Sequence, residues 1–131
     1  MEIQQQITQR INNLAGGFKD YSIRDLVKDA EQFGPYLKQQ RLETNQIRKF
    51  LDAINQLKTT LAQNNDFSSI ETGVVLLKPK LAYAAARQSS VKPLSEVMSK
   101  AIDKVKDTQD FERLVNFIES IIAYHKAEGG R

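Results

Sequence analysis

Apolar residues recur every three or four positions along most of this sequence, and this spacing restricts the fold more than any other feature. Such spacing places the apolar side chains on one face of an α-helix. The clearest stripe lies between residues 45 and 63 and consists of Ile47, Phe50, Leu51, Ile54, Leu57 and Leu61. Comparable stripes lie at 3–14, 23–33, 70–84, 94–105 and 111–125, and no segment shows convincing strand alternation. We therefore predict an all-α, compact bundle of five to six helices.

The segment Leu76–Arg87 combines strong helix formers with one proline. Pro79 removes a backbone hydrogen bond, so we expect a kink there or a division into two helices. Helical spacing places Lys80, Tyr83 and Arg87 on one face, and small alanines surround them. A ligand could approach such a face closely and meet both positive charge and an aromatic ring. The alternative is a kinked core helix whose cations are merely solvated.

The length of 131 residues favours one domain. We separate an N-terminal segment, residues 1–19, from a helical-bundle domain, residues 20–131, because Gly16 and Gly17 would end the first helix. That first helix could dock on the domain or be held loosely. Ser22 and Asp25 have the spacing of a capping box, and Thr44 is a candidate N-cap for the helix that follows.

Residues suited to catalysis or cofactor binding are scarce. The absence of cysteine excludes disulfides and thiolate metal sites, and it fits a reducing cytoplasm. The one histidine, His125, falls on an apolar stripe, where we predict a hydrogen-bonded core residue. There is no glycine-rich phosphate loop, and the longest apolar run, Val74–Leu77, is far too short to span a membrane. We expect a cytoplasmic protein with no enzymatic activity, no cofactor and no membrane partner.

The net charge of +3 conceals an uneven distribution. Residues 72–106 contain seven lysines or arginines against two acidic residues, whereas residues 107–128 contain five acidic residues against two basic ones. This segregation predicts one basic and one acidic face. A basic face that carries an aromatic residue is common on nucleic-acid-binding proteins, although an ordinary solvated helix surface has the same composition.

Three motifs together resemble a known family. They are Leu42–Phe50 (LETNQIRKF), Leu76–Arg87 (LLKPKLAYAAAR) and Phe117–Lys126 (FIESIIAYHK), the last followed by Gly129 and Gly130. In order and spacing they resemble the small subunit of type III-A CRISPR–Cas effector (Csm) complexes, which belong to an antiviral defence system. The resemblance covers roughly residues 20 to 130.

The resemblance implies an all-helical, non-catalytic protein present in several copies, which lines the channel for a guide–target duplex. Its partners would be guide RNA and target RNA, contacted through their backbones, other effector-complex subunits and copies of itself. Because base pairing reads the sequence in such complexes, phosphate contacts suffice. The RNA-binding candidates that the resemblance implies are Arg41, Arg48, Lys49, Lys78, Lys80, Tyr83, Arg87 and Lys126.

Two other functions remain open on the sequence alone. One is a helical protein-interaction or self-association module with no nucleic-acid role. The other is the equivalent small subunit of type III-B complexes. Each candidate residue could also have a structural or purely solvated role.

Overall fold

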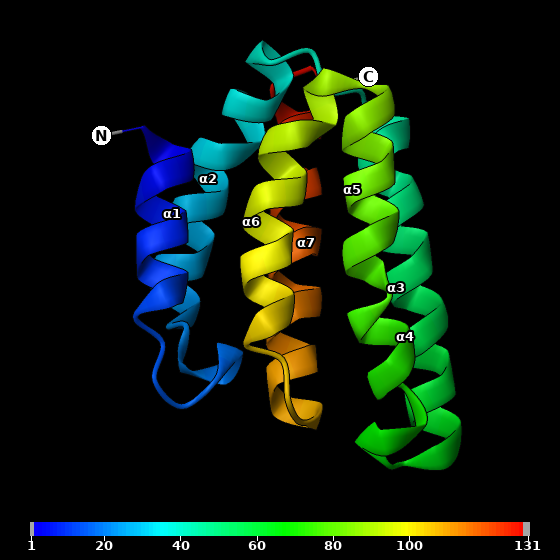
Figure 1. The fold of residues 1–131 in the computed structure, drawn as a ribbon. Helices are drawn as coiled ribbons and strands as arrows, with labels where there is room; N and C mark the ends of the chain where they lie inside the picture. Colours follow the sequence, from blue (N-terminus) through cyan, green and yellow to red (C-terminus); the bar gives the residue numbers. More distant parts are fainter. Residues whose placement is uncertain (1, 130–131) are drawn as a thin grey trace.

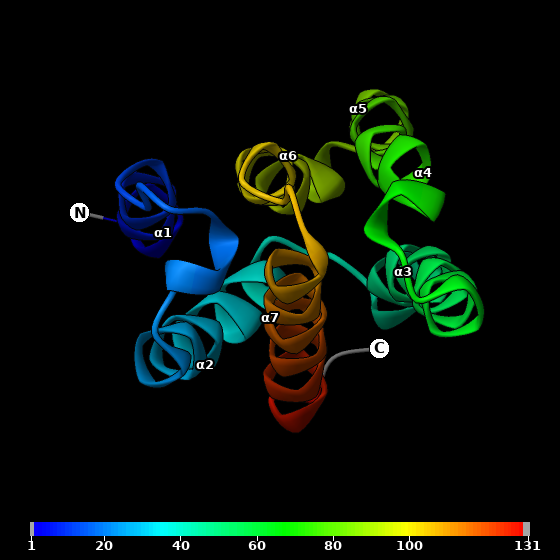
Figure 2. The same ribbon diagram turned by 90° about the horizontal axis from the view of Figure 1, so that it is seen from below.

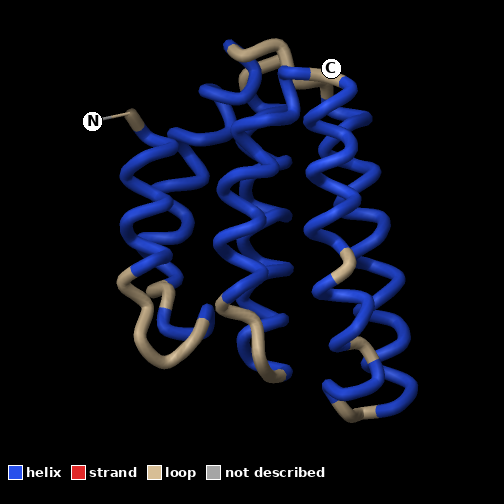
Figure 3. Tube along the Cα trace, in the orientation of Figure 1, coloured by secondary structure: helices blue, strands red, loops and turns tan. Residues whose placement is uncertain are grey.

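A computed structural model describes residues 2–129 and confirms the all-α bundle (Figure 1). The α-helices are α1 (Ile3–Asn12), α2 (Ile23–Gln39), α3 (Thr44–Asn64), α4 (Glu71–Val75), α5 (Leu77–Arg87), α6 (Lys92–Asp103) and α7 (Thr108–Ala127). Three 3₁₀ turns connect them, namely η1 (Phe18–Asp20), η2 (Phe67–Ser69) and η3 (Ser89–Val91). Figure 3 shows only helices and short loops over the described residues. Gly130 and Arg131, the end of the predicted domain, lie outside those residues.

Helix α7 forms the centre of the bundle. In the view of Figure 2, α1 and α2 lie on one side of it and α3, α4 and α5 on the other, with α6 between the two groups. Its buried apolar side chains are Phe111, Leu114, Val115, Phe117, Ile118, Ile121 and Ile122. The ring of Phe117 lies 5.8 Å from that of Phe18 and 5.4 Å from that of Tyr21, measured between centroids. Aromatic packing therefore joins η1 to the central helix.

Helices α2 and α7 approach each other closely at Gly34. A Cβ atom added at Gly34 would lie 2.7 Å from the backbone nitrogen of His125 and 2.9 Å from the carbonyl carbon of Tyr124. Both neighbours are backbone atoms of a helix, so neither can move independently of α7. A residue without a side chain is required here because of this approach.

Replacing Gly34 by alanine should lower the free energy of unfolding by about 1–3 kcal/mol, because α2 and α7 must separate to admit the methyl group. The higher helix propensity of alanine, worth about 1 kcal/mol, offsets part of the loss. Urea unfolding followed by circular dichroism measures the change. Gln32→Ala, at an exposed position of the same helix, is the matched control and should stay within about 0.5 kcal/mol of wild type. An unchanged midpoint for Gly34→Ala would contradict the close approach.

Helix α1 packs against α2 and α6. Ile7 and Ile11 are fully buried, and Arg10 Nε donates a hydrogen bond to Asp29 Oδ2 at 2.9 Å. Asp29 also accepts a hydrogen bond from the Tyr21 hydroxyl at 2.5 Å, and burial is the main reason that the pKa of Tyr21 lies far above its ordinary value. Of the two arrangements expected for the N-terminal helix, the structure has the docked one. The division of the chain at residue 19 stays a prediction.

The helical segment around Pro79 is interrupted at Leu76, three residues before the proline. Leu76 ends α4 and precedes α5, so the segment is divided into two helices, which is one of the two outcomes expected for it, although the division lies at Leu76 and not at Pro79. The described residues form seven α-helices. Pro79 occupies the third position of α5, within the first turn, where helix N–H groups lack partners in any case. A kink at Pro79 itself is not confirmed.

Of the two helix starts that the sequence predicted, one is confirmed and one needs correction. Thr44 is the first residue of α3 rather than its N-cap; Glu43 is the N-cap, and its backbone N–H donates to Gln46 Oε1 at 3.0 Å. Ser22 does cap α2, since its hydroxyl accepts from the Asp25 N–H at 3.3 Å.

Two apolar residues of α2, Ile23 and Val27, are 46% and 38% exposed. They lie at the edge of the buried stripe, because the core-facing residues Leu26, Ala30, Phe33 and Leu37 are centred further round the helix.

Candidate nucleic-acid interface

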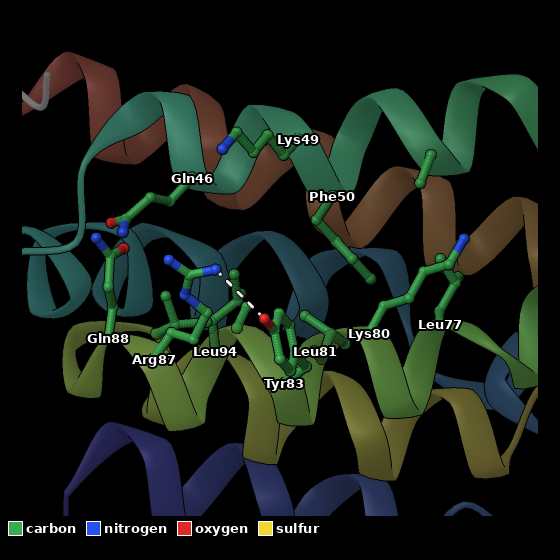
Figure 4. A pocket seen from close by; sticks show the side chains of 13 residues that line it. Gln46, Lys49, Phe50, Leu77, Lys80, Leu81, Tyr83, Arg87, Gln88 and Leu94 are labelled. Carbon is green, nitrogen blue, oxygen red and sulfur yellow. Dashed lines mark hydrogen bonds between the residues drawn. The ribbon is translucent and has the colours of Figure 1, made fainter.

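A groove with a volume of about 480 Å³ runs between α3 and α5 (Figure 4). Helix α3 contributes Gln46, Lys49, Phe50 and Ala53. Helix α5 and the residues that follow it contribute Leu77, Lys80, Leu81, Tyr83, Ala84, Arg87, Gln88, Val91 and Leu94. Four of the eight predicted RNA-binding residues, Lys49, Lys80, Tyr83 and Arg87, therefore line one groove although up to 38 positions separate them in the sequence.

The groove has an apolar floor, formed by Phe50, Leu77 and Leu81, and a charged rim, formed by Lys49, Lys80 and Arg87. Helical geometry explains this arrangement. Leu77 and Leu81 of α5 are 2% and 5% exposed and anchor that helix in the core. Lys80 lies about 100° round the helix from Leu81, and Tyr83 lies further round, about 160° from it; both side chains are exposed. On α3, Lys49 is exposed directly beside the buried Phe50.

Among residues 2–129, no carboxylate forms an ion pair with the cations at the edge of the groove, Lys49, Lys80 and Arg87. The ion pairs in this part of the chain are formed by Arg10, Lys19 and Lys78. Arg87 instead contacts Tyr83. Its Nη1 donates to the Tyr83 hydroxyl at 3.3 Å, and its Cζ lies 5.7 Å from the centroid of the ring, which is 65% exposed. The positive charge of this groove is consequently available to an anionic ligand.

The other four candidates lie outside the groove. Lys78 Nζ lies 2.5 Å from Asp103 Oδ1, so its charge is matched within the molecule. Arg48 is exposed on α3 but does not line the groove. Lys126 is exposed in the last turn of α7. Arg41 lies in the connection between α2 and α3.

Arg41 adopts the left-handed conformation with φ of 68°. Its N–H donates to Lys38 O at 2.9 Å, and the N–H of Leu42 donates to Leu37 O at 3.0 Å. These two bonds form a Schellman motif that ends α2, with arginine in the position that glycine usually occupies.

His125 forms hydrogen bonds to the same connection between α2 and α3, and it is a core residue, as predicted. It is fully buried, with Nε2 2.6 Å from Leu42 O and Nδ1 3.3 Å from Thr44 Oγ1. Because a carbonyl oxygen only accepts, Nε2 is the donor to Leu42, and in the neutral imidazole the Thr44 hydroxyl donates to Nδ1. The side chain thereby joins α7 to the start of α3, the helix that carries Lys49.

Two of the five acids that the charge count assigned to an acidic face, Asp107 and Asp110, are engaged within the bundle, whereas Glu112, Glu119 and Glu128 are exposed. Asp110 is 1% exposed and accepts backbone hydrogen bonds from Lys19 and Lys106, at 2.8 and 3.0 Å. Asp107 pairs with Lys19 Nζ at 2.7 Å. That hydrogen bond holds the pKa of Asp107 below its ordinary value and raises the pKa of Lys19. Asp107 and Asp110 thus stabilise the bundle internally.

Sequence reasoning missed two residues of the groove, Gln46 and Gln88. Figure 4 shows their amides at one end of the groove, from α3 and from the residue after α5. Neither carries a charge, and 42 positions separate them, so only the fold brings them together. Within the described part of the chain, no cluster of three or more histidine, cysteine or acidic residues could hold a metal ion. No helix there is long and apolar enough to cross a bilayer.

Over residues 2–129, fold and site together define an all-helical protein with an open groove whose cations form no ion pairs. Comparison with known proteins identifies the family. Residues 20–131 match the family model described as "Csm2 Type III-A". The Streptococcus thermophilus protein "CRISPR system Cms protein Csm2" is 30% identical over 92 residues, which cover 69% of this chain and 75% of that protein. No solved structure matches. The chain belongs to the Csm2 family of type III-A CRISPR systems and is a structural component, the small subunit, of a multi-subunit effector complex.

Proposed function

We propose that this subunit binds the backbones of guide and target RNA through the α3–α5 groove, without sequence specificity and without catalysis, within a cytoplasmic effector complex. The observation that carries the proposal is the convergence of Lys49, Lys80 and Arg87, all exposed and free of ion pairs in the described chain, around one open groove. Phosphates attract such cations in any sequence context, and each neutralised phosphate releases condensed counterions.

Family membership supports this use of the groove. In RNA-guided complexes base pairing selects the target, so the protein needs to recognise only the backbone and shape of the duplex. The groove supplies charge and room for that purpose.

The proposal includes contacts with neighbouring subunits and with copies of the same chain. Exposed apolar side chains belong to α2 and to the α4–α5 interruption, and Figure 2 shows these elements on opposite sides of α7. Val75 and Leu76 are 54% and 50% exposed beside the α4–α5 interruption, whereas Ile23 and Val27 are exposed on α2. Two different patches on opposed sides are what a head-to-tail contact between identical chains needs.

Neutralising two rim cations tests the RNA-binding proposal. We expect Lys80→Gln/Arg87→Gln to weaken binding of a short single-stranded RNA by at least about tenfold at 50 mM salt. The slope of log affinity against log salt should become shallower by about 1.4, since each phosphate contact on a single strand contributes about 0.7. Filter binding with the full chain over a salt series measures both quantities.

The matched control is Arg24→Gln/Lys28→Gln, which removes two exposed cations from α2, away from the groove. It should leave the slope unchanged. Equal affinity and slope for wild type and the Lys80/Arg87 variant would contradict the proposal and would favour a protein-interaction module.

A further inference from the structure

Contacts with the RNA backbone would use the cations at the rim of the α3–α5 groove but would not use the apolar residues of its floor. Phosphate groups need cations, whereas this floor consists of apolar side chains. Phe50 and Leu81 are almost completely buried, and the small side chain of Ala84 leaves room beside them. Tyr83 lines the same groove and is 65% exposed. A flat apolar ligand could pack against this exposed aromatic ring and bury the apolar floor at the same time.

The polar groups around this floor are arranged at different points of the groove. In Figure 4, Lys80 lies toward one end, the amides of Gln46 and Gln88 lie at the other, and Tyr83 and Arg87 lie between them. The hydrogen bond from Arg87 to the Tyr83 hydroxyl and the contact of its guanidinium with the ring restrain the orientation of the aromatic side chain. The volume of about 480 Å³ is in the range of small-ligand sites.

We infer that this groove receives an unpaired nucleobase of the bound RNA, stacked on Tyr83, while the rim cations hold the phosphates on either side. The inference rests on the proposed RNA-binding function and deepens it. Aromatic side chains stack on any base, because every base has a π face. Base stacking on Tyr83 is thus compatible with binding that ignores sequence.

The neutral amides fit the same ligand. Gln46 already accepts from the Glu43 N–H through Oε1, which leaves its NH₂ group as a donor toward the groove end. Gln88 brings both a donor and an acceptor. Base edges carry donors and acceptors in every case, so the two amides can contact an inserted base without selecting one base strictly.

The experiment compares two RNA strands on wild-type protein and on variants of residue 83. The probes are fluorescently labelled uridine dodecamers, one intact and one in which the central nucleotides are abasic but the phosphates are retained. Wild type should bind the intact strand about tenfold more tightly than the abasic strand, the effect of one lost base–aromatic stack. Tyr83→Ala should bind both strands equally. Tyr83→Phe, which keeps the ring and loses the hydrogen bond to Arg87, should retain the preference.

The salt series separates failure of this inference from failure of the proposed function. If wild type binds with the expected salt slope, and Tyr83→Ala shows the same ratio between intact and abasic strands as wild type, base insertion is wrong while backbone binding stands. If neither strand binds with a salt slope that depends on Lys80 and Arg87, both proposals fail. Because Tyr83 is exposed, the variants should fold normally, and circular dichroism verifies this.

Discussion

His125→Ala is expected to lower the free energy of unfolding by about 3–5 kcal/mol. The substitution deletes a fully buried ring and leaves a cavity between α7 and the α2–α3 connection. It also leaves the Leu42 carbonyl and the Thr44 hydroxyl without their partner, and each buried polar group left unpaired costs about 1–3 kcal/mol. Urea unfolding followed by circular dichroism at 25 °C measures the loss.

His125→Gln serves as the matched variant, because its amide can still donate to Leu42 O and fills part of the cavity. We expect it to lose clearly less stability than His125→Ala. If the free energy of unfolding of His125→Ala fell by less than about 1 kcal/mol, the buried hydrogen bonds between α7 and the α2–α3 connection would not be important to stability.

Asp110→Ala should have a comparable effect on stability, about 3–5 kcal/mol, for a different reason. The carboxylate, itself 1% exposed, accepts from the backbone N–H of Lys19 and of Lys106, and its removal leaves both donors without this partner. Hydrogen bonds to a charged group contribute about 1.5–3 kcal/mol each. The same urea experiment applies, with the m-value as a check that unfolding stays two-state.

Asp110→Asn distinguishes lost hydrogen bonding from lost packing. Asparagine has nearly the shape of aspartate but one acceptor oxygen instead of two, so one of the two backbone donors would face an NH₂ group. We expect an intermediate loss. If alanine and asparagine variants were both as stable as wild type, the tie between η1 and the start of α7 would be unimportant to the fold.

The helices could be predicted from the sequence because each long one has an apolar stripe that the core then buries. In α3, Ile47 and Ile54 are buried as predicted, whereas Leu57 is only half-buried because the later turns of α3 extend beyond most of the bundle. The interruption at Leu76 could not be placed from the sequence. Pro79 predicts a disturbance in that segment, but a proline is also accepted in a first turn, and that is where the fold puts it.

The candidate site was predicted in its residue types and not in its geometry. Spacing along one helix brings Lys80, Tyr83 and Arg87 together, and periodicity shows this. The addition of Lys49 from α3 and of the two glutamines requires knowledge of which helices are neighbours. Lys78 illustrates the converse, because Asp103, 25 positions away, neutralises it through a contact that no local pattern reveals. Charge counts along the chain therefore overestimated the free charge on both faces.

The Schellman turn at Arg41 has a consequence for any attempt to make this protein more robust. An arginine with φ of 68° is strained, by roughly 1 kcal/mol relative to glycine, which adopts positive φ freely. Glycine at position 41 would thus raise the melting temperature and remove an exposed cation in the same step. At position 41, heat resistance and electrostatic attraction for a polyanion therefore change in opposite directions, so a variant chosen there by melting temperature alone would have one positive charge fewer.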